Sequence, residues 1–202
     1  MRIRIAAALT VLGLAASACG TSSGSGTAAG ATTPSSHPTA SSPSAAPWVR
    51  IKDPSGVSFL FPTSTTPTLT TTSVGTTRTY LANAGGGAAI SVVIVPTPIA
   101  LNVKNFVVQY PLKLRADGNT NVAGGAIAPV VVQGIKGFQT DVRYDALPGP
   151  SHLYEQRTAL QLAKYFVVIS AVSGGNHALG TADIAQAKAI NAQLVRGFLL
   201  HN

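Results

Sequence analysis

The stretch WVRIKDPSGVSFLFP, from Trp48 to Pro62, contains two short apolar segments on either side of Asp53-Pro54-Ser55-Gly56. Proline presets one turn dihedral and glycine tolerates the other, so this order of residues is typical of a tight turn between two strands. The stretch therefore predicts an antiparallel hairpin at the start of a folded domain.

Further strand patterns follow along the chain, separated by turn residues. The predicted strands are residues 77–81 paired with 88–95 around the turn 83–87, residues 138–144, and residues 152–162 paired with 165–172 around Ala163-Lys164. In the segment 138–144, Phe138, Thr140, Val142 and Tyr144 alternate with polar residues. This alternation indicates one buried and one wet face.

Two segments show helical spacing instead. The first carries an apolar stripe that Asn102 is placed to cap, and Pro111 predicts a kink or an end near Gln109 or Tyr110. The second is predicted to begin with Thr181 as its cap and Asp183 in its first turn. The first stripe is Val103, Phe106, Val107, Tyr110 and Leu114; the second is Ile184, Ala187, Asn191 or Ile190, Leu194 and Phe198.

The resulting order, four strands, a helix, a second group of strands and a helix, indicates the α+β class. We expect an antiparallel sheet of about five to seven strands, with the helices packed over its apolar face. Residues 48–202 are enough for one domain with its own core. Six aromatic residues are expected to face that core: Phe59, Phe61, Phe138, Tyr144, Phe166 and Phe198.

Residues 1–18 have the pattern of a signal peptide. Arg2 and Arg4 precede an uncharged stretch from Ile5 to Ala18, which is shorter than the roughly 20 apolar residues that a bilayer requires. The sequence therefore predicts export and removal of this segment.

Cys19, the single cysteine of the chain, follows this apolar stretch directly. Ala16-Ser17-Ala18-Cys19 resembles the bacterial lipobox, in which the cysteine carries diacylglycerol and becomes the new N-terminus. Two attached lipid groups give the stable anchoring that one acyl chain does not. Ala16-Ser17-Ala18 is also an A-x-A site for ordinary signal peptidase, which would release a soluble protein. We expect the lipidated form, anchored on the extracytoplasmic side of the cell membrane.

Residues 19–47 form the expected acylated N-terminus and tether. From Gly20 to Pro47 the chain is almost wholly Gly, Ser, Thr, Ala and Pro, with His37 as the one ionisable side chain. Such a composition buries too little apolar surface to fold, and it predicts a disordered spacer. O-glycosylation of this segment stays open.

The formal net charge of the chain is +8, and removal of Arg2 and Arg4 leaves +6. No three basic residues are consecutive, so nucleic-acid binding is not expected. The surplus suits anionic lipid headgroups or an acidic wall polymer, but a mildly basic, solvated surface without a partner is the preferred explanation.

Several motifs together resemble the PsbP-like fold, most closely the LpqN-type lipoproteins of mycobacteria and relatives. They are the Trp48–Pro62 stretch, the segment GIKGF at Gly134–Phe138, the strands containing Arg157 and residues 165–168, and RGFLL after the last helix. The resemblance covers essentially all of Trp48–Leu200. It implies a non-enzymatic binding or assembly module, as in the photosystem subunit and the small-GTPase-binding protein of that family. Neither partner carries over, because no residue here matches their functional sites.

No motif in the sequence predicts catalysis, a metal or a cofactor. His37, His152, His177 and His201 are scattered and no ligand spacing occurs. Ser173 precedes Gly174-Gly175 without the upstream glycine of a nucleophile elbow, and the glycine pairs lack the Lys-Ser/Thr of a phosphate-binding loop. We expect turns at these positions.

Three charged residues, Asp141, Arg143 and Arg157, are candidates for the lining of a polar groove on adjoining strands, and cross-strand ion pairing on a wet sheet face is the preferred interpretation. Asp141 and Asp145 share a strand face, with backbones about 13 Å apart. That separation favours solvated surface carboxylates over an acid–base pair.

The function expected from these observations is a tethered, non-catalytic module that binds a protein of the cell envelope. The alternative is a carrier or chaperone of an envelope lipid or glycolipid, and a wall-polymer hydrolase is the weakest hypothesis because acidic residues are so few. The ligand-binding residues are not predicted. An apolar pocket between the sheet and the helix that begins at Val103 would favour the carrier.

Overall fold

A computed structural model describes residues 48–73, 75–97, 102–147, 149 and 151–201. The signal-peptide, lipidation and tether predictions for residues 1–47 lie outside the described residues. The elements are β1 (Val49–Lys52), β2 (Val57–Phe61), β3 (Thr68–Thr72), β4 (Gly75–Gly85), β5 (Ala88–Pro96), α1 (Val103–Ala116), β6 (Thr120–Gly124), β7 (Ala128–Val132), β8 (Ile135–Ala146), β9 (Ser151–Gln161), β10 (Tyr165–Gly175), α2 (Thr181–Arg196) and β11 (Leu199–Leu200).

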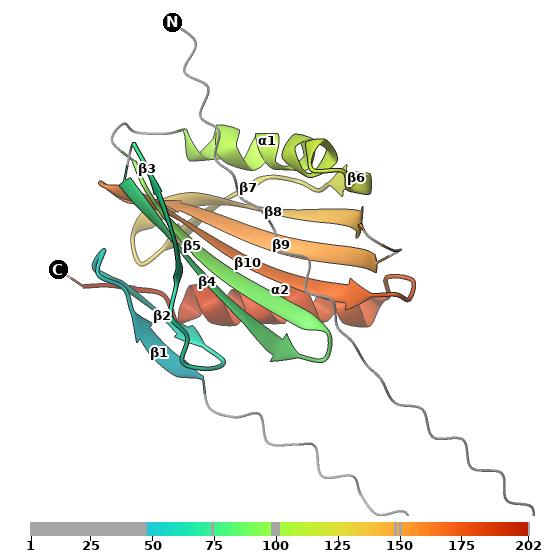
Figure 1. The fold of residues 1–202 in the computed structure, drawn as a ribbon, viewed down its shortest axis with the longest axis horizontal. Coiled ribbons are helices and arrows are strands. Elements are labelled where there is room, and N and C mark those ends of the chain that lie inside the picture. The colour runs from blue at the N-terminus through green and yellow to red at the C-terminus, as the bar shows by residue number, and fades with distance from the viewer. Residues whose placement is uncertain (1–47, 74, 98–101, 148, 150, 202) are drawn as a thin grey trace, which may run out of the picture. The chain divides into compact units, whose positions relative to one another are not determined.

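The strands form two antiparallel sheets, which confirms the α+β class (Figure 1). The larger sheet has eight strands in the order β3-β4-β5-β10-β9-β8-β6, with β7 also paired to β8. This is more than the five to seven expected. The added strands β3, β6 and β7 have five residues each and mostly exposed side chains. They therefore lack the apolar alternation that reveals a strand in sequence.

The hairpin predicted from Trp48–Pro62 is confirmed. Strands β1 and β2 pair antiparallel, with Ile51 opposite Phe59. They belong to the smaller sheet, whose third strand is β11 at the other end of the chain, paired to β2 through Leu199 and Ser58. The C-terminal segment thus completes the sheet that the first strands begin.

The other two predicted strand pairs, β4 with β5 and β9 with β10, are also confirmed. Strand β5 pairs with β10 as well, which places β5 inside the larger sheet. Its apolar residues Ile90, Val92 and Ile94 belong to the main core, while Ala89, Ser91 and Val95 on the other face are half-buried.

Two helices cover opposite faces of the larger sheet. On β9, the side chain of Arg157 contacts Tyr110 of α1, while that of the next residue, Thr158, contacts Asn191 of α2. Successive strand residues point to opposite faces, so α1 and α2 lie on opposite sides. In Figure 1, α1 lies beside β8 and β6, and α2 passes behind β10 and β4.

Helix α1 continues through Pro111, so a helix end near Gln109 or Tyr110, one of the two predicted outcomes, is wrong: the helix spans Val103–Ala116. Tyr110 before the proline and Leu114 after it are both buried in one cluster with Val142. This burial offsets the roughly 3 kcal/mol that an interior proline costs a helix. The predicted cap is confirmed, because Asn102 Oδ1 accepts the backbone N–H of Asn105 at 3.2 Å.

Helix α2 is capped by Gly180 instead of Thr181, which corrects the predicted start by one residue. The carboxylate of Asp183 accepts the backbone N–H of Gly180 at 2.8 Å, so the acceptor comes from inside the first turn. The threonine hydroxyl is not needed there. The buried residues are Ala187, Ile190, Asn191 and Leu194, while Ile184 is half-buried and Phe198 is buried just beyond the helix end.

Two glycines of the segment GIKGF are required by the backbone. Gly134 has φ +78° in the turn between β7 and β8, a value that favours glycine. A Cβ at Gly137 would lie 2.2 Å from the carbonyl oxygen of Ala159 on the neighbouring strand. Both positions are therefore structural.

An aromatic group joins the smaller sheet to the larger one in the main core. The rings of Phe59 and Phe61 are 5.6 Å apart, and those of Phe59 and Tyr80 are 5.0 Å apart, both edge to face. Five of the six aromatic residues predicted to face the core are buried, and Phe138 is half-buried. Offset and edge contacts of this kind add to the stabilisation from burial alone.

Candidate functional site

A group of four polar side chains is buried between α1 and the larger sheet: Tyr110, Tyr144, Glu155 and Arg157. Arg157 donates from Nε to Glu155 Oε1 at 2.9 Å, and its Nη2 lies 2.8 Å from the same oxygen. The hydroxyl of Tyr110 donates to Glu155 Oε2 at 2.7 Å. The guanidinium carbon of Arg157 also lies 3.3 Å from the centre of the Tyr110 ring, so one tyrosine contacts both charges.

The environment favours the charged form of Arg157 and the neutral form of the two tyrosines. Burial raises the pKa of Tyr110 and Tyr144, and the nearby charge of Glu155 raises both further, against the opposing effect of Arg157. Burial lowers the pKa of Arg157, but the carboxylate of Glu155 and the Tyr110 hydroxyl raise it by more. Both oxygens of Glu155 accept hydrogen bonds, so the arrangement is that of a structural ion pair that attaches α1 to the sheet.

The predicted wet-face pairing of Arg157 with Asp141 and Arg143 is wrong. Arg157 lies directly across from Thr140 of β8, and its side chain is 5% exposed. Asp141 and Arg143 are odd-numbered neighbours of Thr140 on that strand and point to the other face. The sequence pattern alone could not reveal this, because it does not fix the register between β8 and β9.

Asp141 and Asp145 lie on the α2 side of β8 and have separate partners. Asp145 Oδ1 lies 2.6 Å from His152 Nδ1, and its other oxygen accepts from Asn121 at 2.6 Å. The hydrogen bonds from Asn121 and His152 lower the pKa of Asp145. Asp141 lies by Tyr154, whose pKa is raised to about 12 by burial and by the carboxylate. The two carboxylates therefore serve different contacts.

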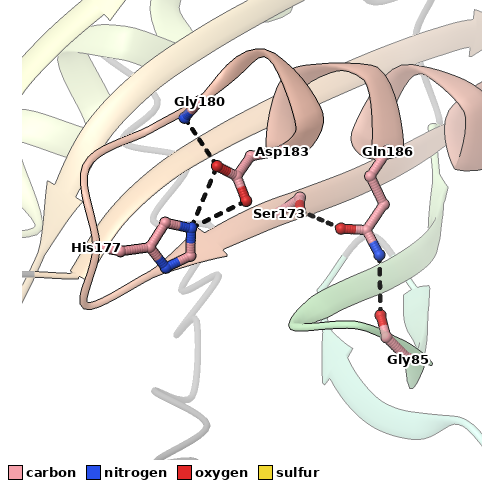
Figure 2. A network of polar contacts seen from close by, with 6 residues as sticks. All are labelled: Gly85, Ser173, His177, Gly180, Asp183 and Gln186. Atoms are coloured by element: carbon pink, nitrogen blue, oxygen red, sulfur yellow. Dashed lines mark hydrogen bonds and ion pairs between the residues drawn. The ribbon is translucent and has the colours of Figure 1, made fainter. Parts of the chain in front are cut away.

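Ser173 and His177 lie near the start of α2, where Figure 2 shows two separate sets of contacts. Ser173 is fully buried and donates to Gln186 Oε1 at 2.7 Å, and Gln186 in turn donates to the carbonyl of Gly85 at 3.1 Å. His177 Nε2 lies 3.2 Å from both carboxylate oxygens of Asp183. The serine hydroxyl thus bonds to an amide and the histidine to a helix-capping carboxylate.

The histidines have separate neighbours where the structure describes them. His152 and His177 bind aspartates, and His201 Nε2 lies 2.7 Å from the hydroxyl of Ser58. His37 lies outside the described residues. Among the residues that are described, no three His, Cys, Asp or Glu side chains are grouped so as to hold a metal ion.

Asp53, in the first predicted turn, has a role that the sequence did not indicate. Its buried carboxylate accepts the backbone N–H of Ser55 at 2.8 Å and the hydroxyl of Tyr80 at 2.7 Å, with Arg78 Nη1 3.7 Å away. Burial and this hydrogen bond raise the pKa of Tyr80. The turn is thereby attached to β4 of the larger sheet.

An open cavity of about 680 Å³ lies where the turns β1–β2, β7–β8 and β9–β10 meet β11. Its apolar lining includes Ile135, Leu162, Tyr165 and Leu200, and Lys136 and Lys164 are its charged residues. These residues come from distant parts of the chain, which is why no motif in the sequence predicts the cavity. The apolar pocket considered between the sheet and α1 would occupy the space in which Tyr110, Tyr144, Glu155 and Arg157 pack.

None of the helices in the described part of the chain is long and apolar enough to cross a membrane. No protein-family model and no curated protein sequence matches the chain. Among solved structures, the chain is similar to cyanobacterial PsbP from Synechocystis, at 10% identity and a TM-score of 0.49, over 81% of this chain and 98% of that one. It is also similar to a Pseudomonas aeruginosa protein of unknown function, at 7% identity and a TM-score of 0.47, over 77% and 98% of the two chains.

Proposed function

We propose that the chain is an exported lipoprotein of the PsbP-like, LpqN type, anchored through a diacylglycerol on Cys19 to the extracytoplasmic side of the cell membrane. In this proposal residues 48–202 form a non-catalytic module that binds a protein of the cell envelope, and residues 19–47 allow the module to reach it. A flexible Gly/Ser segment followed by prolines gives such a reach.

The observation that carries the proposal is the state of the carboxylates. All six acidic residues of the chain lie in the described part, and five of them form a side-chain hydrogen bond or an ion pair within the fold, while Asp141 lies beside Tyr154. The five pairs are Asp53 with Tyr80, Asp117 with Lys113, Asp145 with His152, Glu155 with Arg157, and Asp183 with His177. Acid–base catalysis needs a carboxyl group that is free to exchange a proton with a substrate. Here these groups hold turns, helix ends and strands.

The cations have the opposite distribution, which suits binding. Of the twelve Lys and Arg residues in residues 48–201, Arg78, Lys113 and Arg157 form ion pairs with carboxylates, and nine do not. The excess leaves a basic surface on a domain of charge +6. Electrostatic complementarity would then favour an acidic partner and speed the encounter with it.

Replacing Cys19 with alanine should abolish lipid attachment. Cells grown with an alkynyl fatty acid should label the wild-type chain and leave the Cys19→Ala chain unlabelled, because the thiol is the acceptor of diacylglycerol. A Ser22→Ala chain serves as the matched control and should label like wild type. Equal labelling of the Cys19→Ala chain, or none of the wild type, would contradict the anchor.

The binding function is tested by crosslinking intact envelopes and recovering the tagged chain. We expect one envelope protein to be enriched repeatedly with the full chain. A chimera that carries residues 1–47 before an unrelated globular domain is the control, and it should not enrich that protein. If the full chain enriches nothing beyond the chimera, the proposed function is wrong.

The alternative function is that of a carrier of an envelope lipid or glycolipid. One observation favours it: part of the lining of the open cavity is apolar, including Leu162 and Leu200. Native mass spectrometry of the chain purified from its own membrane distinguishes the two functions. A stoichiometric bound lipid, beyond the anchor on Cys19, would support the carrier.

A further inference from the structure

We infer that the open cavity between Lys136 and Lys164 binds an acidic segment of the envelope protein, with an apolar side chain of that segment seated between the two lysines. The inference rests on the proposed function and specifies the chemistry of the partner. It goes beyond a general basic surface, because it assigns the contact to one place in the fold.

The cavity has an apolar floor that is accessible from solvent. Ile135 is 9% exposed, Leu162 and Tyr165 are half-buried, and Leu200 is 42% exposed. A partner that buries an apolar side chain here would remove part of this surface from water. Protein interfaces typically combine such an apolar centre with a polar rim, and a few anchor residues supply most of the affinity.

The rim is positive and has no internal counter-charge. Lys136 and Lys164 are both exposed, and among the described residues neither forms an ion pair or a side-chain hydrogen bond. No acidic residue lines the cavity. Asp53 precedes the lining residue Ser55 by two positions, but its side chain is fully buried against Tyr80.

The backbone holds the two lysines on separate supports. Lys136 lies in β8 opposite Val131 of β7, and Lys164 lies in the β9–β10 turn, where its carbonyl accepts the N–H of Thr97 at 2.9 Å. Because the backbone of both lysines is already held in place, less conformational entropy is lost when a segment binds to them. Two lysines that are carried on ordered backbone and line the same apolar cavity suit carboxylates on either side of an apolar residue.

An acyl chain fits this place less well than a protein segment. Sites that hold small apolar ligands enclose most of the ligand surface, whereas this cavity is open. Both faces of the larger sheet are already covered by helices with buried side chains such as Tyr110 and Asn191. A partner that spans the opening would make contact with the floor and both lysines together.

The test is site-specific photocrosslinking in intact cells that express the full chain. A photoreactive benzoylphenylalanine replaces Ala163, which lines the cavity and is exposed, and in a control chain it replaces Ala182, which is exposed on α2. We expect the probe at position 163 to crosslink to the envelope protein within a segment rich in Asp and Glu, and the probe at position 182 not to do so.

The second arm changes the charge of the rim. Lys136→Glu with Lys164→Glu should lower the crosslinking yield at position 163 by about tenfold or more, since like charges now face the segment. The matched control, Lys104→Glu with Lys188→Glu, makes the same change in charge at exposed positions on the two helices and should alter the yield less than about twofold.

The possible results separate the inference from the proposed function. If envelope crosslinking recovers a partner but the probe at position 163 does not reach it, reaches a non-acidic segment, or reaches lipid only, the inference is wrong and the function stands. The same holds if both double variants lower the yield equally. If no partner is recovered with any chain, the proposed function fails and the inference with it.

Discussion

Replacing Glu155 with alanine is expected to lower the free energy of unfolding by about 3–5 kcal/mol. The substitution leaves the guanidinium of Arg157 buried without its counter-charge, and it removes the acceptor of the Tyr110 hydroxyl. Because Tyr110 lies on α1, contact between this helix and the sheet should weaken as well. Urea unfolding of the purified chain at pH 7, followed by circular dichroism, measures the change.

Two further variants show whether the loss comes from the unpaired charge. Glu155→Leu combined with Arg157→Met removes both charges and should recover most of the stability, since apolar residues of similar volume often replace a buried pair at little cost. Asp117→Ala breaks the exposed pair with Lys113 on α1 and should cost at most about 0.5 kcal/mol. A Glu155→Ala chain as stable as the Asp117→Ala chain would contradict this account of the ion pair.

The second large effect is expected at Phe59, where alanine should lower the free energy of unfolding by about 3–5 kcal/mol. The ring is fully buried and contacts the rings of Phe61 and Tyr80. Its removal leaves a cavity between the smaller sheet and β4. We expect the loss in urea unfolding and, independently, as a lower midpoint of thermal unfolding.

Leu69→Ala is the matched control, because it also removes a large apolar side chain from a strand. Leu69 is 60% exposed on β3, so the change in unfolding free energy should stay within about 0.5 kcal/mol. If the two substitutions lower the free energy of unfolding by similar amounts, Phe59 does not join the smaller sheet to the main core.

Part of the candidate site could be anticipated from single residues. Asn102 precedes α1 and Asp183 lies in the first turn of α2, because a short polar side chain at these places satisfies free N–H groups at a helix start, a local rule that needs no tertiary contact. The burial of Arg157 could not be anticipated, because it depends on which residue of β8 lies opposite it. A shift of one residue in that register would turn the guanidinium to the face of the sheet that α2 covers, away from Tyr110 of α1.

The cavity rim is a similar case. Lys136 and Lys164 are separated by two strands, and in the sequence each is one basic residue in or beside a turn. Only the meeting of three turns with β11 makes them neighbours of the same apolar floor. The length of helix α1 also depends on tertiary contacts. Helix propensity alone would end the helix at Pro111, but residues on both sides of the proline are buried, and the helix extends to Ala116.

The sequence by itself determined the α+β class, the hairpin at Trp48–Pro62, the strand pairs with tight turns and the two helical segments. Each of these follows from residue period and turn chemistry, which act over a few neighbours. Tertiary structure alone decided the register of β8 against β9, the burial of Glu155 with Arg157, and the joining of β11 to the first hairpin. Those features depend on contacts between segments far apart in the chain, whose free energy comes from burying side chains and charges together.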